Sequence, residues 1–297
     1  MTCAVDSFVV GWTNATLKVP ELFETLVAST QFIGNSRTPF EAINRYVRFT
    51  FPDPFESRCT FNPNCTHYLR AILNRWLPGG EGIDIVGQQT SILRYVLNFG
   101  TQEDSPYSIK FKRPILIPCP VDGHTHKHII SSEEKLYNLP MIDLLIEDCR
   151  NEISISDALK NFIGRLLNVP RIHQCNNVDR SNGGTHKDSC YNMVTRGNLE
   201  IEVLPKIIFI NLPKIFVFSR NYSVDRTFTL HKRNYKLASI LQHSPGHFRC
   251  ILFDSSDNPY VYDDMVDRGI FKRIQLISLD QNKDSDWKHT VLIYYSI

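Results

Sequence analysis

The sequence predicts an α+β fold in which helices come first and a mostly antiparallel sheet follows. Up to about residue 105, apolar side chains recur at helical spacing. From residue 199 on, short runs rich in β-branched and aromatic residues alternate with turns. One amphipathic helix lies between these two regions. This order differs from the regular alternation of strand and helix that builds a doubly wound parallel sheet.

Five segments of the first part carry helical patterns. The first, residues 6–12, follows a cysteine at position 3 and has Ser7 near its start. In the later segments, apolar residues lie three and four positions apart, as on the buried side of an amphipathic helix. Proline or glycine lies near the ends of several of them, as is typical of helix ends. The later segments are residues 19–30, 39–49, 65–77 and 88–99.

The second part of the chain is predicted to form the sheet. Residues 110–119 are expected to form a strand, and residues 126–130 are expected to return as its partner. Residues 153–167 begin with serines that can cap a helix and continue with an amphipathic pattern. The polar stretch 174–190 is expected to be a loop between strands. Further strands are expected at residues 199–205, 206–212, 214–220, 228–232, 235–242, 247–254, 260–264 and 288–297.

Charge and composition exclude several classes of protein. The 297 residues include 33 basic and 31 acidic side chains, which gives a formal net charge of +2. This balance gives no electrostatic reason to expect nucleic acid or an anionic membrane as a partner. The most apolar window, residues 204–218, contains two prolines and two lysines and is too short to span a bilayer.

The cysteines and the N-terminal residues indicate a reducing compartment. The eight cysteines are spread too thinly for a disulfide scaffold. The first residues have neither the basic start nor the apolar run of a secretion signal. We therefore expect a cytoplasmic or nuclear protein, in which the glycosylation sequons at Asn14, Asn64 and Asn221 are not used.

A reactive cysteine needs a base, and the base needs a group that orients it. His247 follows Gly246 and opens an apolar strand, so we expect it at the mouth of a cleft. The next strand returns with Asp263 and Asp264 across the hairpin. One of these carboxylates would fix the imidazole tautomer and stabilise imidazolium, which would hold Cys3 as a thiolate. The choice between the two carboxylates stays open, because adjacent residues of a strand face opposite ways.

Five stretches of the chain resemble motifs of the ubiquitin-specific proteases, in the order of that family. TCAVDS resembles the cysteine box, and HSPGHFRCILFD followed by YVYDDMV resembles the histidine box. Between them, GQQTSILRYVL resembles the family's GQQD-type helix, and LPKIIFINLPKIF resembles its LPxxLxxxLKRF strand. The last strand, WKHTVLIYYSI, resembles the closing AYxLxY strand. The resemblance therefore covers nearly the whole chain.

This resemblance implies a papain-like cysteine peptidase fold, with a helical thumb followed by a mostly antiparallel palm and fingers sheet. It implies a single catalytic domain over residues 1–297, with a thumb-like half at 1–105 and a fingers and palm half at 106–297. The implied activity is hydrolysis of the bond after the C-terminal glycine of ubiquitin or a ubiquitin-like modifier such as SUMO. That modifier and its conjugates are the implied partners.

The same resemblance implies roles for individual residues. Cys3 is the expected nucleophile, His247 the base, and Asp263 the orienting group because it matches the family's first acidic position. The expected supporting residues are Asp264, Asp6, Gly246 and Gln88. The chain departs from the family where Asp6 replaces an asparagine and where Thr90 replaces the acid of GQQD. Only Met1 and Thr2 precede Cys3, so the family's oxyanion asparagine is either absent or lies in a segment upstream of this sequence. Backbone N–H groups at the helix start could form the oxyanion hole instead.

Several of these residues also have a purely structural interpretation. Free cysteines are often small buried apolar residues, so Cys3 could be one of them. Cys250 is expected to be a core residue that faces away from His247, because it lies three positions later in an apolar strand. His243 is the alternative base. The pair Cys59 and Cys65 is expected to be structural.

The implied reaction requires no cofactor, and the only metal to consider is a structural zinc ion. The fingers of the family often hold zinc through two CxxC pairs, and this chain contains no CxxC. A tetrahedral zinc set could still form from Cys119, His124, Cys175 and Cys190. The alternative is a fingers region without metal. Hydrolysis by this mechanism requires no organic or redox cofactor.

Two other functions are compatible with the sequence. The chain could be an inactive or weakly active pseudoprotease that binds ubiquitin or a ubiquitin-like modifier, which the missing oxyanion asparagine favours. It could also be a protease for SUMO rather than ubiquitin, because the catalytic residues do not select the modifier.

Overall fold

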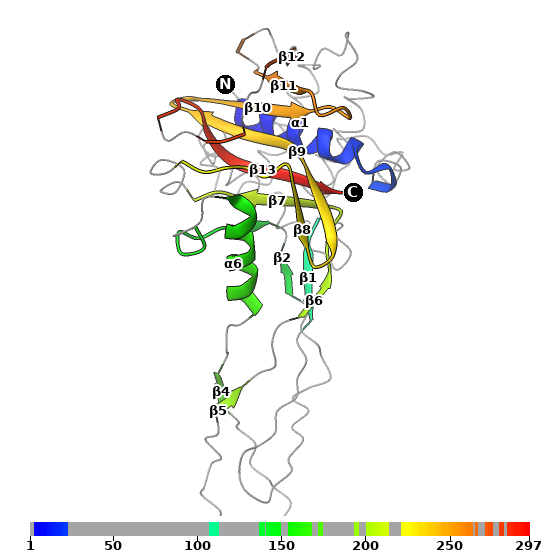
Figure 1. The fold of residues 1–297 in the computed structure, drawn as a ribbon, viewed down its shortest axis with the longest axis vertical. Coiled ribbons are helices and arrows are strands. Elements are labelled where there is room, and N and C mark those ends of the chain that lie inside the picture. The colour runs from blue at the N-terminus through cyan, green and yellow to red at the C-terminus, as the bar shows by residue number, and fades with distance from the viewer. Residues whose placement is uncertain are drawn as a thin grey trace, which may run out of the picture.

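A computed structural model describes the chain at residues 3–22, 107–112, 137–139, 141–149, 154–167, 172–174, 193–195, 200–213, 221–263, 265–266, 271–275, 279–281 and 284–297. The helices predicted at 39–49, 65–77 and 88–99 and the strand predicted at 214–220 lie outside these residues. Within them, a long N-terminal helix and a later helix accompany a mostly antiparallel sheet, which confirms the predicted α+β class (Figure 1).

The described helices are α1, Cys3–Leu17, and α6, Ile155–Leu167. The described strands in chain order are β1 Ile109–Lys112, β2 Tyr137–Leu139, β3 Ile142–Asp143, β4 Ile172–Gln174, β5 Met193–Thr195, β6 Glu200–Val203, β7 Ile207–Asn211, β8 Thr227–Leu230, β9 Arg233–Ser244, β10 His247–Phe253, β11 Pro259–Tyr262, β12 Lys272–Arg273 and β13 Lys288–Ser296.

The main sheet has the strand order β12-β11-β10-β9-β13-β7-β3, and β8 pairs with the first part of β9. Neighbouring strands are antiparallel except for β3 and β7, which are parallel. A second sheet has the order β2-β1-β6, and β4 pairs with β5 in a separate ribbon (Figure 1). The partner predicted for β1, residues 126–130, lies outside the described residues, and β1 pairs instead with β2 and β6.

Two tight turns join β9 to its neighbours. Between β9 and β10, Pro245 is followed by Gly246 at φ 76°, the pattern of a type II turn, in which only glycine is comfortable at the second central position. This turn makes His247 the first residue of β10. Between β8 and β9, His231 and Lys232 have φ of 44° and 67°. These residues form the turn and not the end of a strand at 228–232, because positive φ at two central residues is the geometry of a hairpin turn.

Helix α1 lies against one face of the main sheet. A Cβ added at Gly11 would lie 2.9 Å from Leu241, 3.1 Å from the sulfur of Cys250 and 3.2 Å from Ile293, so only glycine allows this close approach. Cys250 is fully buried at this contact, which confirms the prediction that it is a core residue. Near the first turn of the helix, Phe8 packs against Phe209 of β7.

A buried asparagine connects α1 to two strands. The amide nitrogen of Asn14 donates hydrogen bonds to the carbonyl oxygen of Ala238 at 2.8 Å, the hydroxyl of Ser239 at 3.2 Å and the carbonyl oxygen of Phe253 at 3.3 Å. Ser239 in turn donates to the carbonyl of Gly11 at 3.0 Å. Because Asn14 is only 1% exposed, its sequon is not available for glycosylation in the folded protein.

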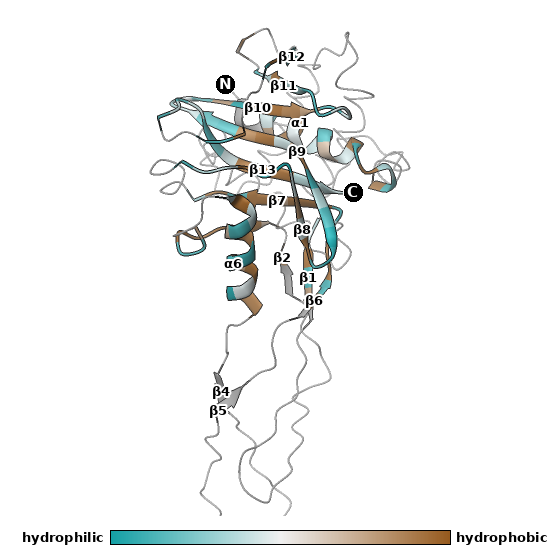
Figure 2. Cartoon of the chain, in the orientation of Figure 1, coloured by the Kyte–Doolittle hydropathy of each residue, from teal (hydrophilic) through white to brown (hydrophobic). Residues whose placement is uncertain are grey.

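The opposite face of the sheet packs against α6. Along α6, Ile155, Leu159 and Phe162 are buried in one cluster with Ile251 of β10 and Leu292 of β13. Successive strand residues face opposite ways, so these sheet residues lie on the other side from those that contact α1. Figure 2 shows β7 as almost wholly hydrophobic and α6 with both a hydrophobic and a hydrophilic side.

Helix α6 begins where its sequence predicted. The hydroxyl of Ser154 accepts a hydrogen bond from the backbone N–H of Asp157 at 3.2 Å and donates to the carboxylate of Asp157 at 3.0 Å. Ser154 is therefore the N-terminal cap of α6, and its hydroxyl satisfies one of the N–H groups left without an intrahelical partner.

Candidate active site

The centre of the candidate site is a histidine and an aspartate on the β10–β11 hairpin. Nε2 of His247 lies 2.7 Å from Oδ1 of Asp263, and the two side chains are only 15% and 11% exposed. The same oxygen accepts hydrogen bonds from the backbone N–H groups of Met265 at 3.0 Å and Val266 at 3.1 Å. Three donors therefore hold the carboxylate in one orientation, as an orienting group requires.

The second ring nitrogen of His247, Nδ1, is the candidate proton acceptor. With Asp263 accepting at Nε2, the proton of the neutral ring is at Nε2 and Nδ1 carries a lone pair. Nδ1 is buried and has no hydrogen-bond partner in the part of the chain that the structure describes. A buried basic nitrogen without a partner is costly unless something else occupies it, so this atom is suited to accept a proton from a nucleophile.

Helix α1 begins at the same end of the sheet. Gly11 is opposite Cys250 and Asn14 is bound to Phe253, so α1 and β10 run in the same direction. From this crossing, eight helical residues back to Cys3 span about 12 Å. Three strand residues back to His247 span about 10 Å. The first residue of α1 and the first residue of β10 therefore lie toward the same end, where Figure 1 marks the N-terminus.

The other residues named from the sequence are placed as follows. Cys3 opens α1, and its side chain lies outside what the structure describes. Asp6 is buried in the first turn of α1, where a carboxylate is favourable for the helix dipole. Gly246 forms the turn before His247. The remaining residues, Asp264, Gln88, Cys119, His124, Cys175 and Cys190, lie outside the described residues.

His243, the alternative base, has a different environment. Its ring packs on Phe248 with the centroids 4.6 Å apart, and its backbone pairs with Phe248 and Lys288. The bond to Asp263 is made by His247. This arrangement favours His247 as the base.

Sequence reasoning missed the aromatic and cationic neighbours of His247. The ring of Trp287 meets that of His247 edge to face, with centroids 5.6 Å apart. The guanidinium of Arg249 lies 3.9 Å from the centre of the Trp287 ring, and burial lowers the pKa of Arg249 while Asp263 opposes that shift. The alternation of strand residues could have placed Arg249 beside His247, but only the sheet order brings Trp287 to them.

His289 is a second histidine near Arg249, and it stays uncharged. His289 of β13 is 5% exposed, and burial, followed by the charge of Arg249, lowers its pKa to about 3. Its backbone N–H donates to the side-chain oxygen of Gln281 at 2.8 Å. His289 is therefore a structural histidine at neutral pH.

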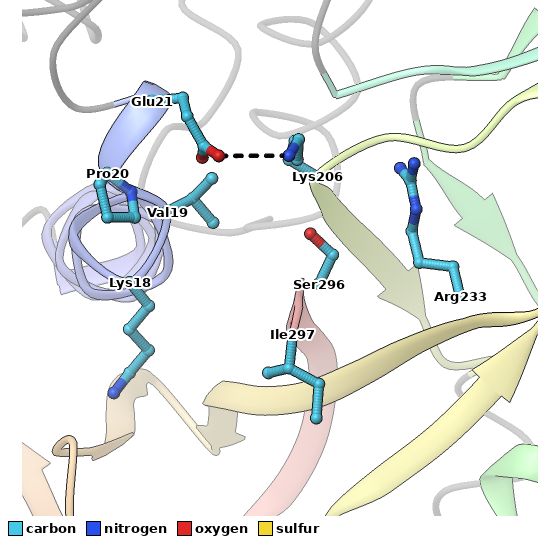
Figure 3. A pocket seen from close by; sticks show the side chains of 8 residues that line it. All are labelled: Lys18, Val19, Pro20, Glu21, Lys206, Arg233, Ser296 and Ile297. Carbon is cyan, nitrogen blue, oxygen red and sulfur yellow. Dashed lines mark ion pairs between the residues drawn. The ribbon is translucent and has the colours of Figure 1, made fainter.

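The described residues form a pocket that is remote from Cys3. A pocket of about 290 Å³ lies at the C-terminal end of α1, lined by Lys18, Val19, Pro20, Glu21, Lys206, Arg233, Ser296 and Ile297 (Figure 3). Glu21 and Lys206 form an ion pair of 3.5 Å across it. This pocket is at the opposite end of α1 from Cys3. Nowhere in the described ranges do three or more His, Cys, Asp or Glu side chains gather as a metal site.

The chain has the papain-like fold of the ubiquitin-specific proteases, as the sequence predicted. The solved structures that show this are of the SAGA DUB module, which contains Ubp8. The yeast module with an Sgf73 variant matches with a TM-score of 0.54 and 13% identity, over 100% of this chain and 66% of that one. A Ubp8, Sgf11, Sus1 and Sgf73 module bound to monoubiquitin matches with a TM-score of 0.52 and 14% identity, over 100% and 67%.

The similarity to these solved structures is limited to the fold. No family model and no curated protein sequence matches the chain. The chain spans about two thirds of the length of the solved structures it matches. At these identities the similarity concerns the fold. Among the described residues, no helix is both long and apolar enough to cross a membrane.

Proposed function

We propose that the chain is a cysteine isopeptidase that hydrolyses the bond after the C-terminal glycine of ubiquitin or a ubiquitin-like modifier. The observation that carries the proposal is the pair of His247 and Asp263, with Nδ1 of His247 left without a hydrogen-bond partner among the described residues. The start of α1 at Cys3 lies toward the same end of the sheet, which supports Cys3 as the nucleophile. The fold supports the reaction class.

The proposed reaction begins with a proton transfer from the Cys3 thiol to Nδ1 of His247. The thiolate attacks the carbonyl carbon of the terminal glycine and forms a tetrahedral oxyanion. The C–N bond then breaks, and Nδ1 returns the proton to the departing lysine amine, which leaves a thioester on Cys3. Water gives a proton to Nδ1 and attacks the thioester, the C–S bond breaks to release the carboxyl group of the modifier, and Nδ1 returns its proton to the Cys3 sulfur. Asp263 keeps the ring in one tautomer throughout.

Backbone N–H groups at the start of α1 are the proposed oxyanion hole. The first N–H groups of a helix have no intrahelical partner and lie at the positive end of the helix dipole. They would stabilise both the thiolate and the tetrahedral oxyanion. The reaction then consumes only water and needs no cofactor, and the cytoplasm or nucleus is the expected compartment.

Covalent labelling tests the proposal. Ubiquitin, SUMO and related modifiers with a C-terminal electrophile would be incubated with the wild-type chain, with Cys3→Ala and with Cys149→Ala. Cys149 is fully buried, so its variant is a matched loss of one thiol that should keep the reaction. One solved neighbour is a module bound to monoubiquitin, which makes ubiquitin the first modifier to test.

The outcomes separate the candidate functions. A covalent adduct that Cys3→Ala loses and Cys149→Ala keeps would support the isopeptidase and name its modifier. An adduct with SUMO alone would assign the same chemistry to a different modifier. A folded chain that binds a modifier but forms no adduct would instead indicate a pseudoprotease, and an adduct that survives in Cys3→Ala would exclude Cys3 as the nucleophile.

A further inference from the structure

A chain of side-chain contacts leads from β9 to the ring of His247. The carbonyl oxygen of the Gln242 side chain accepts a hydrogen bond of 2.8 Å from Nε of Arg249. The guanidinium of Arg249 lies 3.9 Å from the centre of the Trp287 ring. Trp287 then meets His247 edge to face, with the ring planes at 70° and the centroids 5.6 Å apart. This distance is within the favourable range for an aromatic pair.

Trp287 is itself fixed from its backbone. Its carbonyl oxygen accepts hydrogen bonds of 3.0 Å from the side-chain nitrogen of Gln281 and from the hydroxyl of Ser285. Its N–H donates to the same hydroxyl at 3.2 Å. The backbone of Trp287 is therefore held by hydrogen bonds, and the guanidinium of Arg249 covers one face of its indole ring. A planar guanidinium suits this second contact because it stacks on an aromatic ring and keeps its charge at any physiological pH.

His247 needs a second contact to set the direction of Nδ1. Its bond to Asp263 fixes Nε2 but allows the ring to turn about the line between the two atoms. The χ2 torsion of histidine has broad minima, so rotamer preference alone does not prevent this rotation. The edge contact with Trp287 restricts it. Since a misplacement of about 1 Å can cost two orders of magnitude in rate, this restriction matters for proton transfer.

We infer that Trp287 is a positioning residue for His247, and that Arg249, held by Gln242, acts on His247 through Trp287. The inference rests on the proposed function for its kinetic consequences, whereas the restriction of the ring is a property of the folded protein alone.

The kinetic test uses Trp287→Ala, Trp287→Phe and, as a matched loss of an aromatic residue, Phe271→Ala. Phe271 packs on Tyr262 in the neighbouring hairpin. With a ubiquitin-derived substrate, Trp287→Ala is expected to lower kcat by about 10- to 100-fold with KM changed less than about twofold. Trp287→Phe should restore most of kcat, and Phe271→Ala should keep it. An unchanged kcat in Trp287→Ala, or a raised KM with unchanged kcat, would overturn the inference.

A double-mutant cycle tests the order of the contacts. If Arg249 acts through Trp287, Arg249→Gln lowers kcat in the wild-type background but has no further effect in Trp287→Ala. Independent, additive losses would show that Arg249 acts on the site by another route, and that part of the inference would then be wrong.

A measurement on the resting protein separates this inference from the proposed function. Carbon-13 relaxation of the histidine side chains reports how far the His247 ring reorients. We expect a rigid ring in the wild type and in Trp287→Phe, and a ring with motion of larger amplitude in Trp287→Ala, with Nε2 protonated in all three because Asp263 still binds it. If no modifier reacts but this pattern appears, the proposed function fails and the positioning role stands. If the chain reacts and Trp287→Ala keeps a rigid ring and full kcat, the positioning role fails alone.

Discussion

The bond network of Asn14 gives a sharp prediction about how α1 is held on the sheet. Asn14→Ala removes the amide that donates to the carbonyls of Ala238 and Phe253 while leaving both acceptors in the core. Ser239 keeps its bond to Gly11, so two carbonyls lose a partner. A net contribution of about 1 kcal/mol for each bond, plus the cost of unsatisfied buried acceptors, gives a loss of about 2 to 4 kcal/mol.

A neighbouring residue supplies the control. Thr13 is also buried, but its hydroxyl bonds to the carbonyl of Val9 within the same helix. Thr13→Val keeps the size of the side chain and removes only this local bond, so we expect a loss below about 1 kcal/mol. Asn14→Asp should destabilise the protein more than Asn14→Ala at neutral pH. The aspartate would place a negatively charged acceptor against two carbonyl oxygens in a buried environment.

Urea unfolding followed by tryptophan fluorescence or circular dichroism measures these free energies by linear extrapolation. The expected order of destabilisation is Asn14→Asp, then Asn14→Ala, then Thr13→Val. If Asn14→Ala lost no more than Thr13→Val, the amide would not be connecting α1 to the sheet in the way the distances indicate.

Three more predictions concern the core and its titration. Gly11→Ala should destabilise the protein by about 1 to 3 kcal/mol, because a Cβ there meets three core atoms within 3.2 Å. Gly164→Ala is the control: it has open space around it and should be neutral or stabilising by up to about 1 kcal/mol. Urea midpoints that shift equally in the two variants would contradict this. The pKa of His289 is lowered to about 3 from an ordinary 6.5, so below pH 6.5 the unfolded state binds a proton that the folded state does not. Stability should therefore fall as pH drops from about 6.5 toward 3, by up to about 1.4 kcal/mol per pH unit from this group, and His289→Gln should flatten that slope in unfolding curves at pH 7, 6 and 5; an unaltered slope would show that another group carries it. Burial raises the pKa of the Cys250 thiol, and Cys149 is also fully buried. Mass spectrometry after iodoacetamide treatment should therefore find both thiols unmodified until urea unfolds the chain. Modification of either thiol before unfolding would mean that this core opens locally.

Local chemistry explains which parts of the fold were predictable. The serine cap before α6, the proline and glycine before His247, and the apolar runs of β7, β10 and β13 each specify structure within a few residues. The hairpin turn at His231 and Lys232 was missed because the pair contains none of the glycine, asparagine or aspartate residues that mark such a turn in sequence. The parallel pairing of β3 with β7 was not predictable from a strand of two residues.

The candidate site divides in the same way. His247 and its acidic partner lie on one hairpin, so short-range pattern sufficed to suggest them. The strand pattern left Asp263 and Asp264 open and only the family resemblance favoured Asp263, whereas the structure shows the bond of Asp263 to His247 directly. Trp287 directly precedes β13, which is separated from β10 by β9, and its contact with His247 depends on sheet order. Such long-range order is set by the packing of the whole core, which no local motif encodes.

The shared direction of α1 and β10 decides where the two chain ends can be extended. Polypeptide joined ahead of Cys3 emerges at the end of the sheet that holds His247, where a substrate tail would have to enter. Polypeptide joined after Ile297 emerges beside Lys18 and Glu21, at the far end of the helix (Figure 3). An affinity tag or fluorescent fusion placed after Ile297 should therefore leave substrate access open, whereas the same tag placed ahead of Cys3 would act as a tethered competitor at high local concentration.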